Sequence, residues 1–309
     1  MKVLYITGWC RSGSTLLGNI LGELPRVAHV GELSYLWSNG VLGIGTNPTC
    51  GCGEDLRACR VWGKVLSLTA ADETALREVA AERVRRHQAH LRTRHTRRRL
   101  AEARGRPVQD ADVRETLAAM TSLYETAAEV LGADVLVDSS KFPAEAAALF
   151  GLDGIDAYAL HLVRDPRATA YSWRRAKAYI PAMDVRRSTA YWTGFNIASE
   201  WIGEAFPGRY RRLRYEDFAA EPARVLAALG RWAGLPGTPP VTAGGVATLG
   251  ENHTVTGNPD RLQRGEVRIR PDNRWIRGLP RGEALTGTVI AAPLLGRYRY
   301  PLLPAPTGR

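Results

Sequence analysis

The stretch that decides the fold is residues 6–21, ITGWCRSGSTLLGNIL. The apolar run at residues 2–7 predicts a buried strand, and an apolar-rich helix is expected from about Ser14 to Leu24. Between them, residues 8–15 have the pattern G-x-x-x-x-G-S-T, typical of a loop that binds phosphate between a strand and a helix. Backbone N–H groups of such a loop, together with the helix N-terminus, favour an anion. The sequence therefore predicts an anion site here, with an ordinary glycine-rich turn as the alternative.

The cation of this loop is unusual. Ser14 stands where kinases and ATPases of this type have a lysine, and Arg11 supplies a positive charge from within the loop. A guanidinium presents a fixed fork of donors to an anionic group with several oxygens. Phosphoryl transfer from ATP uses a loop lysine and magnesium. Because a sulfuryl group carries less charge than a phosphoryl group, this loop favours sulfuryl transfer by protein donors alone.

Strands and helices alternate along the rest of the chain. Further strands are expected at residues 135–138, 157–163 and 209–215. Helices are expected to begin at Pro143 and Pro166 and to span about residues 189–206 and 221–233. This alternation predicts an α/β fold, a three-layer P-loop-type arrangement with a central parallel sheet flanked by helices. A helical insertion is expected at about residues 60–131, and the Pro- and Gly-rich remainder from residue 235 shows no clear period.

Length and composition agree with one globular unit. The 309 residues suit a single domain spanning 1–309, and 45% hydrophobic with 24% charged residues is ordinary globular composition. No apolar run approaches the ~18 residues that a spanning helix needs. The first residues lead directly into the glycine loop and leave no room for a signal peptide. We therefore expect a cytoplasmic protein without a membrane span.

The net charge of +11 is concentrated in one segment. Residues 83–106 contain ten arginines and one glutamate. This segment has no aromatic residue to stack bases and matches no recognition-helix pattern, so a nucleic-acid partner is not expected. A solvated helix face and a patch that attracts an acidic substrate both remain open.

Three cysteines form the pattern C-G-C-x6-C. Cys50, Cys52 and Cys59 are one ligand short of a tetrahedral zinc set. They are either reduced or locally paired thiols in a glycine-rich loop, or a zinc site completed by a distant histidine. The transfer reaction itself is expected to need no metal.

Two motifs carry a resemblance to a known family. Residues 8–17, GWCRSGSTLL, resemble the 5′-phosphosulfate loop of sulfotransferases that use 3′-phosphoadenosine 5′-phosphosulfate (PAPS). Residues 162–173, LVRDPRATAYSW, resemble the 3′-phosphate motif of that family, in which an Arg ends a strand and a Ser follows eight positions later, here Arg164 and Ser172. An arginine at the carboxyl end of a strand also lies where ligands bind in open α/β sheets.

The resemblance implies which residues bind the donor. They are Arg11, Ser12, Gly13, Ser14, Thr15, Arg164, Ser172, Tyr215, Arg264 and Gly265. In this assignment Tyr215, from the segment Arg-Tyr-Glu-Asp, lies near the adenine, and a C-terminal segment at about residues 250–309 closes over the nucleotide. From the residues alone, an ion pair of Arg164 with Asp138 or Asp165 is the alternative to its phosphate contact.

Sulfuryl transfer to a hydroxyl needs an in-line attack, a base and cationic donors. Glu32 is similar in position to the Gly-Glu base of tyrosylprotein sulfotransferases, which implies that it is the base. Aligned on Pro143, Lys141 replaces the catalytic histidine of the phenol and steroid sulfotransferases, so Lys141 and Arg11 are expected to stabilise the leaving oxygen. His29 is the reserve base.

The expected function is transfer of the sulfuryl group of PAPS to a hydroxyl of a small-molecule, lipid or glycoside acceptor. A P-loop small-molecule kinase that uses ATP and magnesium is the alternative, because residues 135–138 form an apolar strand that ends in Asp138, like a magnesium-binding strand. A non-catalytic nucleotide-binding module is the third possibility.

Overall fold

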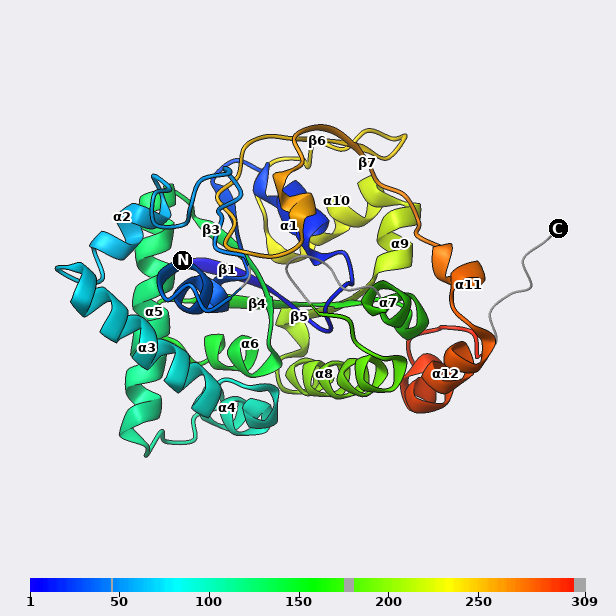
Figure 1. Ribbon diagram of the computed structural model, residues 1–309, viewed down its shortest axis with the longest axis horizontal. Coiled ribbons are helices and arrows are strands. Elements are labelled where there is room, and N and C mark those ends of the chain that lie inside the picture. Colours follow the sequence, from blue (N-terminus) through cyan, green and yellow to red (C-terminus); the bar gives the residue numbers. More distant parts are fainter. Residues whose placement is uncertain (46, 175–180, 303–309) are drawn as a thin grey trace.

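A computed structural model describes residues 1–45, 47–174 and 181–302 (Figure 1). Its main sheet has five strands in the order β2-β3-β1-β4-β5, and every neighbouring pair is parallel. The strands are β1 Lys2–Thr7, β2 Val27–Gly31, β3 Val135–Lys141, β4 Asp156–Val163 and β5 Tyr210–Arg214. The prediction of a central parallel sheet flanked by helices is confirmed.

Helices cover both faces of the sheet (Figure 1). One face packs against α1 Ser14–Gly22 and α10 Pro222–Ala233, through a cluster of buried apolar residues that includes Leu4 and Ile6 of β1. The other face packs against α6 Pro143–Leu149 and α8 Val185–Ala205, through a cluster that includes Val3 and Tyr5. Because side chains alternate along a strand, the continuous apolar run of β1 supplies both clusters.

Local signals in the sequence set the ends of several helices. The helices α6 and α7 Pro166–Trp173 begin at a proline, as predicted, and Asp165 caps α7 by accepting a hydrogen bond from the Arg167 N–H. The helix α5 Ala111–Leu131 ends at Gly132, whose φ of 61° is the left-handed conformation that favours glycine. These short-range features place α6 and α7 directly after the strands whose ends form the site.

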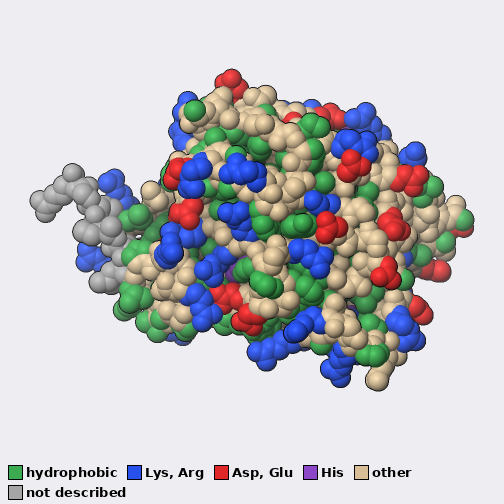
Figure 2. Space-filling model, turned by 180° about the vertical axis from the view of Figure 1, so that it is seen from behind, with side chains coloured by type: hydrophobic (Ala, Val, Ile, Leu, Met, Phe, Trp, Pro, Cys, Tyr) green, Lys and Arg blue, Asp and Glu red, His purple; other side chains and the backbone are tan. Residues whose placement is uncertain are grey.

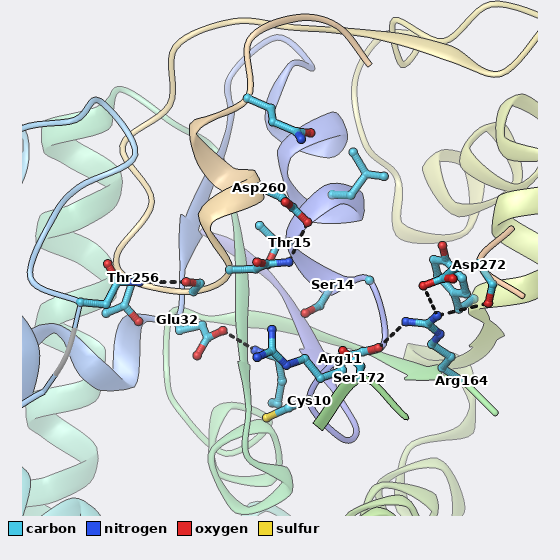
Figure 3. A pocket seen from close by; sticks show the side chains of 18 of the residues that line it. Cys10, Arg11, Ser14, Thr15, Glu32, Arg164, Ser172, Thr256, Asp260 and Asp272 are labelled. Carbon is cyan, nitrogen blue, oxygen red and sulfur yellow. Dashed lines mark hydrogen bonds and ion pairs between the residues drawn. The ribbon is translucent and has the colours of Figure 1, made fainter. Parts of the chain in front are cut away.

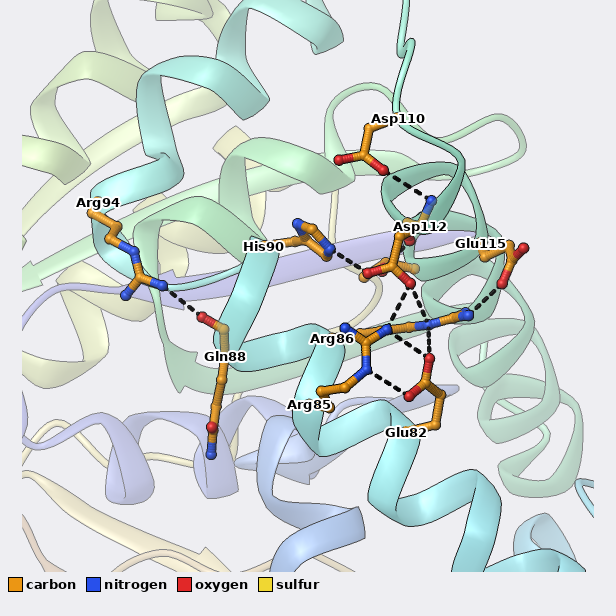
Figure 4. A network of polar contacts seen from close by, with 10 residues as sticks. Glu82, Arg85, Arg86, Gln88, His90, Arg94, Asp110, Asp112 and Glu115 are labelled. Carbon is orange, nitrogen blue, oxygen red and sulfur yellow. Dashed lines mark hydrogen bonds and ion pairs between the residues drawn. The ribbon is translucent and has the colours of Figure 1, made fainter.

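The predicted insertion lies between β2 and β3. It contains α2 Trp62–Ser67, α3 Glu73–His90, α4 Thr96–Ala103 and α5. Arginines of the basic segment tie α3 to α5 (Figure 4). Arg85 and Arg86 both form ion pairs with Asp112 at the start of α5, at 2.8 and 2.9 Å, and with Glu82 on their own helix. Part of the positive charge of residues 83–106 is therefore neutralised by ion pairs inside the insertion.

Several elements were not predicted. The edge strand β2 is only five residues long, and its sequence Val-Ala-His-Val-Gly has no clear alternation. In the C-terminal part, where no period was found, the chain forms a two-stranded antiparallel sheet and two helices. These are β6 Val246–Leu249, β7 Gly265–Arg268, α11 Arg274–Gly278 and α12 Arg281–Leu295. The helix α12 contains four β-branched residues and Pro293, and it packs on α7 and α8, so tertiary contacts rather than local propensity support it.

A buried histidine in β4 predicts how stability changes with pH. Burial lowers the pKa of His161 to about 3, and its ring nitrogens lie 2.6 Å from the Tyr210 hydroxyl and from Asn196 Oδ1. The unfolded histidine, with a pKa of about 6.5, binds a proton that the folded one does not, so its contribution to stability is lost as the pH falls from about 6.5 toward 3. We expect His161→Gln to reduce the slope of unfolding free energy against pH, between about pH 4 and 6, by up to about 1.4 kcal/mol per pH unit. Denaturant titrations over this range would measure it, and equal slopes would contradict the prediction.

Candidate active site

The carboxyl ends of all five strands contribute to one cavity of about 940 Å³ (Figure 3). Across the sheet, Glu32 follows β2, Lys141 ends β3, Arg11 lies in the loop after β1, Arg164 follows β4 and Tyr215 follows β5. All five line this cavity. Because parallel strands end at the same edge of a sheet, residues scattered through the sequence meet there.

Backbone geometry shapes the loop after β1. Gly8 and Gly13 have φ values of 125° and 89°. A Cβ on Gly8 would lie 2.5 Å from the Leu162 carbonyl oxygen, and one on Gly13 would lie 2.7 Å from the Tyr215 ring. Arg11 also adopts a positive φ, 68°. The loop is thus pressed against β4 and Tyr215, and only glycine fits at its two ends.

The predicted anion-binding residues of the loop divide into two groups. Gly13, Ser14 and Thr15 line the cavity at the N-terminus of α1, where the helix dipole favours negative charge. Ser12 is buried and is not part of the described cavity lining. The Arg11 guanidinium carbon lies 5.2 Å from the centre of the Trp173 ring, and this cation–π contact stabilises the positive charge of Arg11 beside the loop.

Glu32 and Lys141 form an ion pair at one end of the cavity. The Lys141 Nζ donates hydrogen bonds to Glu32 Oε1 at 2.6 Å and to the Ser139 carbonyl at 2.7 Å. Burial alone would lower the pKa of Lys141, but the charge and the hydrogen bond of Glu32 help to raise it above its usual value. The Glu32 N–H donates to the Val255 carbonyl at 2.8 Å, which fixes the backbone that carries the carboxylate.

His29 lies outside the described lining of the cavity. It is 5% exposed, and its ring nitrogens lie 2.8 Å from Asn19 Oδ1 and 3.1 Å from Ser139 Oγ. Burial, with the nearby charge of Lys141, lowers the pKa of His29 to about 3. With both nitrogens engaged in the core, this histidine is badly placed to act as the reserve base.

Arg164 occupies the other end of the cavity (Figure 3). Its guanidinium donates to the Arg11 carbonyl at 3.0 Å, pairs with Asp272 Oδ2 at 3.0 Å and lies 4.6 Å from the centre of the Tyr215 ring. Ser172, on α7, lines the same cavity. Arg164 and Ser172, the two residues predicted to bind the 3′-phosphate, therefore face the same cavity.

The alternative partners of Arg164 have other contacts. Asp165 forms an ion pair with Arg167 at 2.7 Å, and Asp138 accepts hydrogen bonds from the Tyr124 and Ser140 hydroxyls, both at 2.6 Å. Arg164 is instead held by Asp272, whose own pKa is held well below its usual range by the hydrogen bonds of Arg274, together with the charge of Arg164. The carboxylate that faces Arg164 thus comes from the C-terminal segment.

The comparisons with known proteins identify the family of this chain. The model of the sulfotransferase family matches residues 4–240, which include the loop, Glu32, Lys141, Arg164 and Tyr215. The chain belongs to the sulfotransferase family. No curated protein matches this sulfotransferase in sequence.

Two solved structures resemble the sulfotransferase over nearly its whole length. One is the sulfotransferase domain from the Synechococcus PCC 7002 olefin synthase, with 18% identity, a TM-score of 0.57 and coverage of 98% of this chain and 96% of that one. The other is the sulfotransferase domain from the curacin biosynthetic pathway, with 16% identity, a TM-score of 0.50 and coverage of 97% and 98%. At these identities the likeness is one of fold.

In this sulfotransferase, the C-terminal segment contributes different residues from those predicted. Arg264 pairs with Glu251 at 3.5 Å and donates to the Cys52 carbonyl, and neither it nor Gly265 is part of the described cavity lining. Arg268 and Arg270, which sequence reasoning missed, do line the cavity. Their spacing of two residues in an extended segment, which puts both side chains on one face, was the available signal.

Proposed function

We propose that this sulfotransferase moves the sulfuryl group of PAPS to a hydroxyl of a small-molecule, lipid or glycoside acceptor. The observation that carries the proposal is the placement of a carboxylate and a lysine at one end of the cavity and of an arginine with a tyrosine at the other, with the loop between them. PAPS carries one anionic group at the 3′ position and another at the 5′ position of the same ribose, so it requires two separate sets of cationic or N–H donors.

The residues around the cavity fit this donor. Ser14 and Thr15, at the N-terminus of α1, would hold the phosphosulfate, and Arg164 with Ser172 would hold the 3′-phosphate. The ring of Tyr215 would contact the adenine, since it already forms the wall between the loop and Arg164. Arg164 would exchange Asp272 for the phosphate. Arg268 and Arg270 offer further positive charge, whereas Ser12, Arg264 and Gly265 lie outside the described cavity lining, and their contacts with the donor stay predictions.

The ion pair of Glu32 and Lys141 indicates which catalytic role each of the two residues would have. When bound, PAPS supplies the electrophilic sulfur. Glu32 would take the proton of the acceptor hydroxyl as its oxygen bonds to sulfur. Lys141 and Arg11 would offset the negative charge that appears on the phosphate oxygen as its bond to sulfur breaks. The products are the sulfate ester and adenosine 3′,5′-bisphosphate, with the proton on Glu32.

The surroundings of Glu32 support an acceptor with an apolar or ring-shaped face. Tyr35 lines the cavity beside Glu32, and its ring centre lies 6.2 Å from that of Phe142, which follows Lys141. Phe142 in turn lies 6.0 Å from Phe195 on α8. Phe142 is buried and neither phenylalanine is part of the described cavity lining, so of these three rings Tyr35 alone would contact a hydrocarbon or sugar face of the acceptor, with the two phenylalanines packed behind it.

Other expectations about partners stay predictions. On the face that Figure 2 shows, Lys and Arg are spread among Asp and Glu rather than gathered in one patch. That the protein binds no nucleic acid stays a prediction. Of the helices that the structure describes, none has both the length and the apolar character needed to cross a membrane. The cytoplasmic location is part of the proposal.

The kinase alternative is not favoured. Its magnesium ligand would be Asp138, but this residue is 1% exposed, is not part of the described cavity lining and is turned toward Tyr124 and Ser140. Burial, together with the charge of Glu145, raises the pKa of Asp138 to about 7. A carboxyl group in this environment is poorly suited to bind a cation at the cavity.

A direct assay tests the proposed function. We expect purified protein to transfer label from sulfur-labelled PAPS to an acceptor from a panel of phenols, alcohols, lipids and glycosides, without added metal. The same panel with labelled ATP and magnesium should give no labelled product. Label transfer from ATP would favour the kinase. Tight binding of PAPS without transfer to any acceptor would favour a non-catalytic module.

A further inference from the structure

The three cysteines of residues 50–59 meet a histidine that is almost 200 residues away in the sequence. Their sulfur atoms and a ring nitrogen of His253 all lie within 4.8 Å of one another. The His253 Nδ1 is 3.3 Å from the Cys59 sulfur and 3.8 Å from the Cys50 sulfur. The fourth ligand that the cysteine pattern lacked is therefore present in the fold.

These separations match a tetrahedral metal site. With Zn–S bonds of about 2.3 Å and Zn–N bonds of about 2.0–2.1 Å, tetrahedral geometry puts two sulfurs about 3.8 Å apart and a sulfur about 3.5 Å from a nitrogen. The observed sulfur-to-nitrogen distances lie on either side of the second value. Cys50 and Cys59 are 0% and 1% exposed, so the ligands converge on a largely enclosed space.

The surroundings suit a site with a net negative charge. Three thiolates and a divalent cation sum to −1, and Arg60 and Arg264 lie next to the cluster. Arg264 donates to the Cys52 carbonyl, and both arginines pair with Glu251. If Nδ1 of His253 binds a metal, the ring proton is on Nε2. The Nε2–H group then points toward Glu251, whose Oε1 is 3.7 Å away, and Nε2 no longer accepts a hydrogen bond from Arg60.

The cluster joins two segments at the wall of the active site. His253 begins a stretch that runs between the cysteine loop and the end of β2: the Gly51 N–H donates to the Thr254 carbonyl, and the Val255 N–H donates to the Val30 carbonyl. Val255 also accepts the hydrogen bond of Glu32, and Thr256 lines the cavity. A bond between the two segments would therefore hold the backbone beside the proposed base.

We propose that Cys50, Cys52, Cys59 and His253 bind one zinc ion, which fastens the cysteine loop to the C-terminal segment. Three thiolates and one imidazole are a set that zinc prefers, and four protein ligands leave no open position for catalysis. Binding releases the three thiol protons to solvent. The described cavity lining includes none of the four residues, so the metal has a structural role and sulfuryl transfer still proceeds without it as a reactant.

Metal analysis of the full-length protein tests this. We expect untagged protein, purified without chelators, to contain roughly one zinc ion per chain, and His253→Ala and Cys59→Ser each to lose most of it. The matched control is Cys10→Ser, because Cys10 is the one cysteine outside the cluster. This variant should keep the full zinc content.

Cobalt gives a second readout that does not depend on a variant folding. Wild-type protein made with Co²⁺ should show the intense visible bands of tetrahedral cobalt and a thiolate-to-cobalt charge-transfer band. Removal of the metal from the wild type with a strong chelator should lower its melting temperature. Protein that contains no zinc after growth with added zinc, that holds a disulfide within residues 50–59, or whose zinc survives His253→Ala would overturn the proposal.

Discussion

Replacing Glu32 with Gln should lower turnover by about 100-fold or more while leaving donor affinity within a few-fold of the wild type. The amide keeps the size of the side chain and can still accept the hydrogen bond of Lys141, which lies 2.6 Å from the carboxylate. It cannot accept the proton of the acceptor hydroxyl. Because the substitution removes the base but keeps the volume of the side chain, the turnover rate should fall while the affinity for the donor changes little. Initial rates at saturating PAPS and acceptor, with donor binding measured by calorimetry, would check it.

Two further measurements separate a base from a residue that only orients Lys141. Glu129→Gln, at an exposed position on α5, removes the same charge outside the described cavity lining and should leave turnover unchanged. In Glu32→Gln, burial of Lys141 is no longer opposed by the carboxylate, so the pKa of Lys141 should fall. If Glu32 acts only through Lys141, activity of the variant should recover at lower pH, where the lysine is charged again. An unchanged rate with the donor still bound would reject Glu32 as the base.

The shape of the loop between β1 and α1 was predictable because its signal is local. The strand, the two glycines and the hydroxyl residues lie within residues 2–15, and the positive φ values at Gly8 and Gly13 are ones that glycine adopts readily. The placement of Arg164 was predictable for a related reason. It follows a buried apolar strand, and the edge at which a parallel strand ends follows from chain direction alone.

The rest of the site depends on long-range contacts that the sequence does not encode locally. Asp272 meets Arg164 across more than one hundred residues, and His253 meets Cys59 across almost two hundred. Both partners come from the Pro- and Gly-rich segment in which no periodicity was found. His29 and Glu32 are only three positions apart, but they have different surroundings. His29 faces the core between α1 and β3, whereas Glu32 faces the cavity. This difference depends on the strand β2, which the sequence analysis did not predict.

Arg164→Ala should weaken donor binding by about 100-fold, which corresponds to about 3 kcal/mol, as expected for the loss of one charge-assisted contact with phosphate. Arg164 is 8% exposed, and its guanidinium, which lines the cavity, is held in place by the Arg11 carbonyl and the Tyr215 ring. The loss should fall on the 3′-phosphate. The variant should therefore distinguish adenosine 3′,5′-bisphosphate from adenosine 5′-monophosphate much less well than the wild type does, as measured by titration calorimetry.

This ratio of affinities also tests whether Arg164 has only a structural role. If its contact with the Arg11 carbonyl merely supports the loop, Arg164→Ala should weaken both nucleotides equally, and the proposed phosphate contact would be wrong. Arg211→Ala, at an exposed position on β5, removes one positive charge outside the described cavity lining and should leave both affinities unchanged. Asp272→Asn gives the opposite test: since the Asp272 carboxylate now pairs with Arg164 at 3.0 Å, its loss should favour the nucleotide with the 3′-phosphate over the monophosphate. Arg164→Ala should therefore lower the ratio of the affinity for the bisphosphate to that for the monophosphate, and Asp272→Asn should raise it. A general loss of stability would not change this ratio in opposite directions, so this result would assign the 3′-phosphate contact to the Arg164 guanidinium.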